Sequence, residues 1–181
     1  GAQLTYLPTL PFYTLIGAEV LQGDNEILFG PDAESGPHAY TLFAKASLDL
    51  SDNSTVLFGP SMITGKTETG SIADDTEFSG DATLYGLEFT YKWMPSKQQG
   101  LTLQSEYLYR TQKGDLEDTI ALTTESLKRV QDGLYLQGIY QLERWRAGAR
   151  YDMLDLFKDD YILSGSEQDF GKKPWRASGM L

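Results

Sequence analysis

The sequence predicts an all-β fold: an antiparallel up-and-down transmembrane β-barrel, or a roughly eight-stranded part of a larger one. Three observations lead to this fold class. Apolar and polar residues alternate with a period of two along several segments. Short turns alternate with long polar connections, and the chain contains 11 Tyr and 18 Gly among its 181 residues, a composition typical of β proteins. We expect residues 1–181 to form a single β-barrel domain that is incomplete at both ends.

The alternation defines about eight strands. The clearest is 83–93, where Tyr85 and Trp93 end an apolar series and the intervening positions are Gly, Glu, Thr and Lys. Pro60 lies inside another of them and cannot donate to a ladder, which predicts an edge strand or a bulge there. The remaining predicted strands are 3–7, 12–22, 39–50, 55–66, 101–110 and the two arms of the hairpin 133–155.

The connections between these strands differ in length in a regular way. Short turns are expected near 8–11, 51–54, 94–100 and 143–145, and long, mostly acidic loops near 23–38, 67–82 and 111–132. In an antiparallel meander this order places every short turn at one end of the sheet and every long loop at the other. Outer-membrane barrels have this layout, with short periplasmic turns and longer extracellular loops.

A soluble β-sandwich also alternates apolar and polar residues, and it is the main alternative fold. Strands of 10–12 residues suit a tilted membrane crossing better than a sandwich. Aromatic residues near the strand ends predict girdles at two lipid interfaces, formed by Tyr85, Trp93, Trp145 and Tyr151. Charges of both signs on the opposite face predict a water-filled lumen, lined by Lys45, Glu88, Lys92, Glu106, Arg110, Arg146, Arg150 and Asp152.

Four stretches together resemble a known family: "GLYLQGIYQLERWRAGARYDMLD", "LTLQSEYLYR", "AYTLFAKASLDLSDNS" and "FYTLIGAEVLQGD". They cover roughly half of the chain. They are similar to Gram-negative outer-membrane β-barrel proteins of the porin-like, zinc-regulated or TonB-dependent-receptor-like kind. The resemblance implies a bacterial outer-membrane location, a longer chain of which this is an internal part, and a metal ion or metal complex as one class of cargo. Chains of this kind end in a strand with a terminal aromatic residue, and we expect no such strand in the final "RASGML".

Composition narrows the function. A net charge of -11 and a pI near 4.4 argue against nucleic acid as a partner. The absence of cysteine and a single histidine argue against a thiolate or multi-histidine metal centre, so we expect no metal site and no cofactor. The acidic stretches at 24–34, 73–77 and 114–119 could attract calcium, but they lack the ligand spacing of an EF-hand and are better explained as solvated loops.

We expect a channel, not an enzyme. Inward charges could sort small hydrophilic solutes or ions by charge and size, or they could be ion pairs that fill a narrow barrel, depending on the strand number. The alternative function is a binding or adhesion barrel that uses its acidic loops. A hydrolase built on His38 with Ser35 or Ser61 is a third reading, although no G-x-S-x-G motif is present. Membrane lipid is the expected partner, and assembly of copies into a homo-oligomer is left open.

Overall fold

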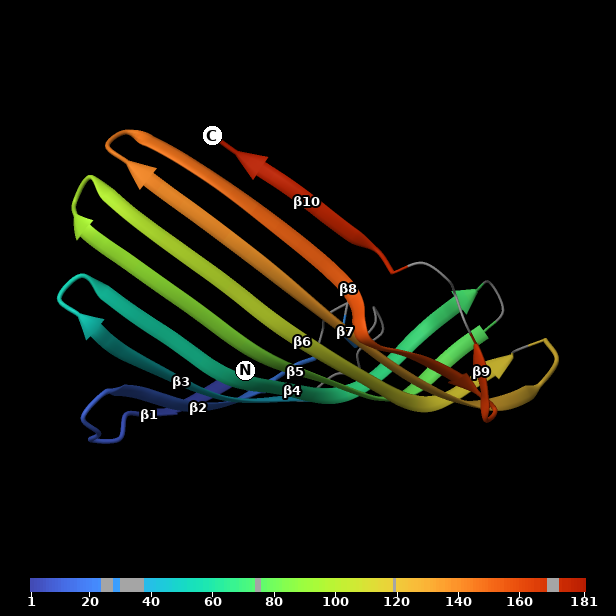
Figure 1. The fold of residues 1–181 in the computed structure, drawn as a ribbon. Coiled ribbons are helices and arrows are strands. Elements are labelled where there is room, and N and C mark those ends of the chain that lie inside the picture. The colour runs from blue at the N-terminus through green and yellow to red at the C-terminus, as the bar shows by residue number, and fades with distance from the viewer. Residues whose placement is uncertain (24–27, 30–37, 74–75, 119, 169–172) are drawn as a thin grey trace.

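The computed structural model describes residues 1–23, 28–29, 38–73, 76–118, 120–168 and 173–181. It is all-β, antiparallel and up-and-down, as the sequence predicts. One sheet runs in the order β1 to β8 and then β10, with β9 paired to β8 (Figure 1). Its strands are β1 Ala2–Tyr6, β2 Tyr13–Leu21, β3 Ala39–Ser51, β4 Ser54–Ala73, β5 Thr76–Ser96, β6 Gln99–Asp118, β7 Thr123–Leu142, β8 Trp145–Leu163, β9 Ser166–Gln168 and β10 Trp175–Met180.

The sheet is open, because β1 and β10 are its two edges and the described residues do not join them. No second sheet packs on it within the described part of the chain. The sandwich alternative is therefore not the arrangement of these residues. The described residues also contain no helix long and apolar enough to cross a membrane.

Four strands are about twice as long as the alternation predicts, and this is the main correction to the sequence analysis. The polar stretches 67–82 and 111–132 are mostly the paired ends of β4 to β7, not long loops. These ends carry polar residues on both faces, so they lack the period-two signal by which a half-buried strand is recognised. Gly80 and Gly114 lie directly opposite each other there, and a Cβ on either would overlap the neighbouring backbone.

The chain end differs from expectation as well. Residues Trp175–Met180 form β10, which pairs with Gly148 to Met153 of β8. The sequence predicts no strand in "RASGML" that ends in an aromatic residue; the segment is part of a strand, and that strand ends in methionine. Its alternation is weak because it mixes small and charged residues, and its pairing depends on the free edge of β8. The shorter β9 pairs with the other half of that edge, at Tyr161 to Leu163.

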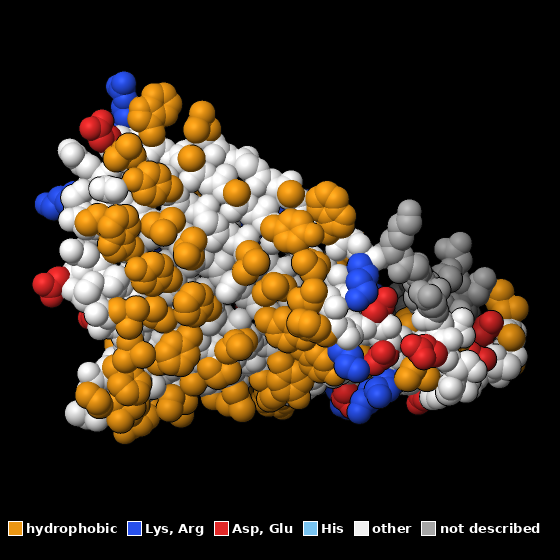
Figure 2. Space-filling model, in the orientation of Figure 1, with side chains coloured by type: hydrophobic (Ala, Val, Ile, Leu, Met, Phe, Trp, Pro, Cys, Tyr) orange, Lys and Arg blue, Asp and Glu red, His pale blue; other side chains and the backbone are white. Residues whose placement is uncertain are grey.

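The two faces of the sheet differ in chemistry. The convex face, seen in Figure 2, carries a broad band of exposed apolar side chains over the half nearest the short turns. Leu42, Leu87 and Leu136 on this face are each more than half exposed. The alternate positions of the strands form the concave face. Along the part of the sheet that carries the apolar band, most of the polar side chains lie on this concave face. Strand periodicity therefore assigns every residue of a strand to one face or the other.

Candidate functional site

A transverse row of charged residues crosses the concave face. The register places Glu88 of β5 opposite Glu106 of β6, Glu106 opposite Tyr135 of β7, and Tyr135 opposite Asp152 of β8. Asp152 in turn lies opposite Arg176 of β10. We call these five residues and Lys45 of β3 the charged row.

Lys45 joins the row through an ion pair that spans three strands. Its Nζ lies 2.7 Å from Oε1 of Glu88, although β4 runs between their strands. The residue of β4 between them is Gly59, which lies opposite Glu88 and whose missing side chain leaves the path open. The β3–β4 ladder has a gap here, which accommodates the missing amide hydrogen of Pro60. Pro60 thus lies in an inner strand, neither at an edge nor at a bulge.

A second cluster forms the other end of the row. Asp152 accepts hydrogen bonds from Arg150 Nε at 2.8 Å and from Arg176 Nε at 3.1 Å. The Arg150 guanidinium also lies over the ring of Tyr135, with 3.9 Å from Cζ to the ring centroid. One carboxylate therefore holds two guanidinium groups, and a ring orients one of them.

The middle of the row consists of two carboxylates. Glu88 and Glu106 are directly opposite on the same face, a placement in which like charges destabilise a sheet. Glu106 forms no ion pair among the described residues. The row thus has a cation at each end, ion-paired with Glu88 or Asp152, and Glu106 lies between the two pairs.

A short segment of the connection between β2 and β3 packs on the same concave face. Phe29 is 2% exposed and lies against Ala39, Ala82 and Ile63. Thr67 Oγ1 donates to the Phe29 carbonyl oxygen at 2.9 Å. A Cβ on Gly65 would come within 2.7 Å of the Phe29 ring, so the lack of a side chain at Gly65 leaves the socket that the ring occupies.

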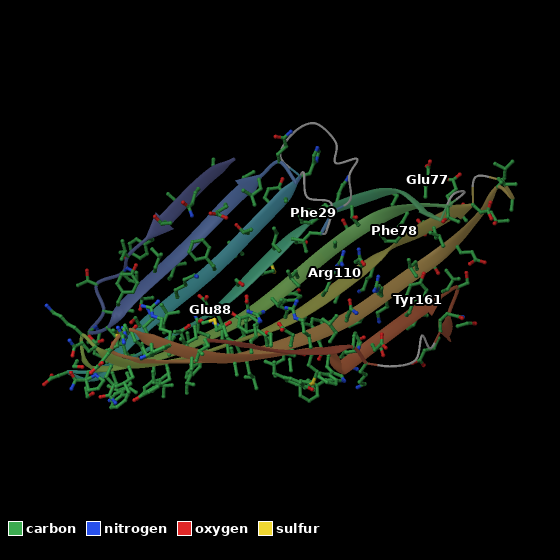
Figure 3. The ribbon with its side chains drawn as sticks, turned by 90° about the horizontal axis from the view of Figure 1, so that it is seen from above. Phe29, Glu77, Phe78, Glu88, Arg110 and Tyr161 are labelled. Atoms are coloured by element: carbon green, nitrogen blue, oxygen red, sulfur yellow. The ribbon has the colours of Figure 1, made fainter. Side chains whose placement is uncertain are left out.

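Arg110 contacts this segment and lines the same cavity as Glu106 of the charged row. Its Nη2 lies 3.4 Å from the Leu28 carbonyl oxygen, and it is labelled with Phe29 and Glu88 in Figure 3, where all three side chains lie in the hollow of the sheet. A cavity of about 570 Å³ extends from there to the second cluster, lined among others by Leu84, Leu108, Arg110, Glu106, Arg150 and Arg176. The cavity combines an apolar floor with charged groups at its margin.

The other predicted lumen residues lie apart from the row. Lys92 is exposed on the concave face of β5, four residues closer to the short turns than Glu88. Arg146 donates to the side chain of Gln141 at 3.0 Å near the β7–β8 turn. The structure therefore brings together Lys45, Glu88, Glu106, Arg150 and Asp152 of the predicted set, and it leaves Lys92, Arg110 and Arg146 outside the row.

The four predicted girdle residues all lie on the convex face. Trp93 and Trp145 are near the short turns, and Trp145 is 59% exposed. Tyr85 lies farther along β5 and contacts Tyr109, with 6.2 Å between ring centroids and the two rings tilted by 43°. Tyr151 is nearer the middle of the band and contacts Trp175, with 6.0 Å between centroids.

The residues considered for catalysis are separated. Ser61 of β4 pairs with Phe43, whereas His38 precedes Ala39, which pairs with Gly65. Ser61 and His38 are therefore separated by five residues along the strands, a distance of about 17 Å. Ser35 and most of the acidic stretch 24–34 lie outside the described residues. The described residues hold no cluster of three or more metal-binding side chains.

Comparison with known proteins gives one relative. The chain is 35% identical over 184 residues to an uncharacterized protein of Aquifex aeolicus (strain VF5). The match covers 93% of this chain and 38% of the relative, so the chain spans well under half of that protein. No family model and no solved structure matches.

Sequence reasoning missed several residues of the site. Arg176 was missed because its strand was not predicted, and Tyr135 because it looked like one more tyrosine of an alternating strand. Leu28 and Phe29 were assigned to a loop and given no inward role. The apolar pair in an otherwise polar connection, "NEILFGPD", is the signal that could have indicated a docked segment.

The Lys45–Glu88 pair is expected to contribute little to stability. The two side chains are 41% and 32% exposed, and exposed ion pairs are worth about 0.2–1 kcal/mol. In a double-mutant cycle with Lys45→Met and Glu88→Gln, we expect a coupling free energy below about 1 kcal/mol from equilibrium unfolding in urea. A coupling of several kcal/mol would assign the pair to the framework of the sheet instead.

Proposed function

We propose that this chain forms part of the wall of an outer-membrane β-barrel channel for small hydrophilic solutes or ions. The convex face meets lipid and the concave face lines an aqueous lumen. The observation that carries the proposal is the charged row: opposed carboxylates at Glu88 and Glu106, between cationic groups, on the polar face of a sheet whose other face is apolar and exposed.

The dimensions of the apolar band support a membrane location. On β5 the apolar side chains of the convex face run from Tyr85 to Trp93, nine residues of a 21-residue strand. A transmembrane strand needs about 9–11 residues when tilted. The exposed leucines of this band would be costly in water and favourable in lipid.

The charges of the concave face support passage of hydrophilic solutes. Charged side chains that line a lumen create a local field, which sorts solutes by charge. Like charges placed side by side cost stability, and Lys45 offsets the charge of Glu88 alone, so Glu106 is better explained by work on a solute than by support of the fold. Leu28 and Phe29, docked on the same face, narrow the space beside the row.

The experiment uses the full-length protein purified from membranes in detergent. We expect its electrophoretic mobility to change on boiling, as for a folded barrel, and discrete conductance steps in planar bilayers. In a salt gradient, Glu106→Lys is expected to shift the reversal potential towards anions, and Arg150→Glu to shift it towards cations. Protein that is folded and monodisperse without detergent, or two variants with the wild-type reversal potential, would overturn the proposal.

A binding or adhesion barrel is the second candidate, and one observation favours it. Strands β5 to β7 continue for about ten residues beyond the apolar band and carry exposed acids there, among them Glu77, Asp115 and Glu117. Such rigid hairpins could present a surface to an external partner. Binding to cells or matrix by protein that gives no conductance would favour this function.

A further inference from the structure

A row of lysines crosses the convex face where the apolar band ends. The register places Lys66 of β4 opposite Asp81 of β5, Asp81 opposite Lys113 of β6, and Lys113 opposite Lys128 of β7. All four side chains are exposed. Figure 2 shows Lys and Arg side chains in blue just beyond the orange band. We call these three lysines the lysine row.

The placement of the lysines is unfavourable for the stability of the sheet. Lys113 and Lys128 are directly opposite on one face, which brings their Cα atoms to about 4.5–5.5 Å and destabilises the pairing. Asp81 is the one acid within the row against three lysines, and Asp115 follows Lys113 two residues along the same face. None of the lysines takes part in the ion pairs of the described residues. In a chain with a net charge of -11, this excess of positive charge is local.

The position of the row points to what would neutralise it. Lys113 lies four residues, about 13 Å, along β6 from Tyr109, which belongs to the apolar band. The flexible lysine stem can reach back along the apolar surface while its ammonium group stays in the polar layer. On the other side, the same face becomes acidic at Asp115 and Glu117. Attraction of an anion is thus confined to a narrow strip at the edge of the band.

We propose that the lysine row binds the phosphate groups of lipid headgroups. The inference rests on the proposed membrane location, since only there does the edge of the apolar band meet a headgroup layer. Ammonium groups form charge-assisted hydrogen bonds to phosphate oxygens, and two opposed lysines can share one phosphate. Lipid then supplies the countercharge that the protein lacks.

Lipid binding to the full-length protein in detergent, measured by native mass spectrometry, tests this proposal. The probes are phosphatidic acid and diacylglycerol, which differ only in the phosphate, and inorganic phosphate. We expect tighter binding of phosphatidic acid, and a loss of about fivefold for each lysine removed in Lys113→Gln, Lys128→Gln and the triple variant with Lys66→Gln. Lys92→Gln, the same charge change on the concave face of β5, is expected to keep wild-type binding.

Each other result overturns the proposal. A triple variant that still prefers phosphatidic acid would place the site elsewhere, and equal competition by inorganic phosphate would indicate a site for free anions. Heat-dependent mobility and conductance, measured on the same preparations, separate the two proposals. If both persist while phosphatidic acid shows no preference, the lysine row fails and the channel stands. If the protein needs no detergent and binds no lipid, both fail.

Discussion

Replacing Phe29 with alanine is expected to release Leu28 and Phe29 from the concave face and to raise the single-channel conductance. The ring is almost fully buried against Ala39 and Ala82, and removing a buried phenylalanine ring costs about 3–5 kcal/mol. Among the described residues, Thr67 and Arg110 also donate hydrogen bonds to carbonyl oxygens of the segment. These hydrogen bonds, about 0.5–1.5 kcal/mol for the neutral one and 1.5–3 kcal/mol for the one from a charged group, stabilise the wild type and the variant alike, so they do not offset the lost contact.

Two further variants make this result specific. Gly65→Val fills the socket from the opposite side, because a Cβ there would lie 2.7 Å from the ring, and it should have the same effect as Phe29→Ala. Phe89→Ala removes a phenylalanine from the convex face, 42% exposed, and should leave the conductance unchanged. Amide hydrogen exchange around Gly65 and Thr67 gives a second readout that needs no channel. Wild-type exchange in Phe29→Ala would show that the ring does not hold the segment.

A large loss of stability is also expected from Asp132→Ala. This carboxylate is 2% exposed and accepts a hydrogen bond from the Tyr107 hydroxyl at 2.7 Å and from the Phe157 amide at 3.1 Å. It lies where the β7–β8 register shifts between Gln131 and Gly133, opposite the extra residues of β8. Without it both donors lose their acceptor, at about 1–3 kcal/mol each.

The loss can be measured as a lower midpoint of unfolding in urea. Tyr107→Phe removes one donor together with its hydrogen bond and should destabilise less, because it leaves only part of the carboxylate unsatisfied. Asp159→Ala is the matched control, since that carboxylate is exposed on the neighbouring strand. Equal midpoints for Asp132→Ala and Asp159→Ala would mean that the bulge of β8 is held by its backbone alone.

The alternation of apolar and polar residues was sufficient to predict the faces of the strands. It placed Lys45, Glu88, Glu106 and Asp152 together on one face, because a period of two assigns every residue of a strand once one is assigned. It could not predict which of them meet. The Lys45–Glu88 pair depends on the register of three strands and on the empty position at Gly59.

The parts that were missed have a common physical cause. Strand ends that are polar on both faces carry no periodic signal, so the sequence predicts loops where β5 extends to Thr76 and β6 extends to Asp118. Asp132 was placed at the end of such a loop, and its burial follows only from the bulge that it faces. Phe29 and Arg176 contribute through contacts between segments distant in sequence, which local patterns do not report.

From β1 to β8, every strand of the sheet pairs with the strand that follows it in the chain. Except between β2 and β3, each pairing therefore closes a short connection at a small entropic cost, and no strand has to wait for a distant one. A sheet of this kind can assemble one hairpin after another. It can also gain or lose a hairpin over evolutionary time while the remaining pairings stay as they are, so that its width changes two strands at a time.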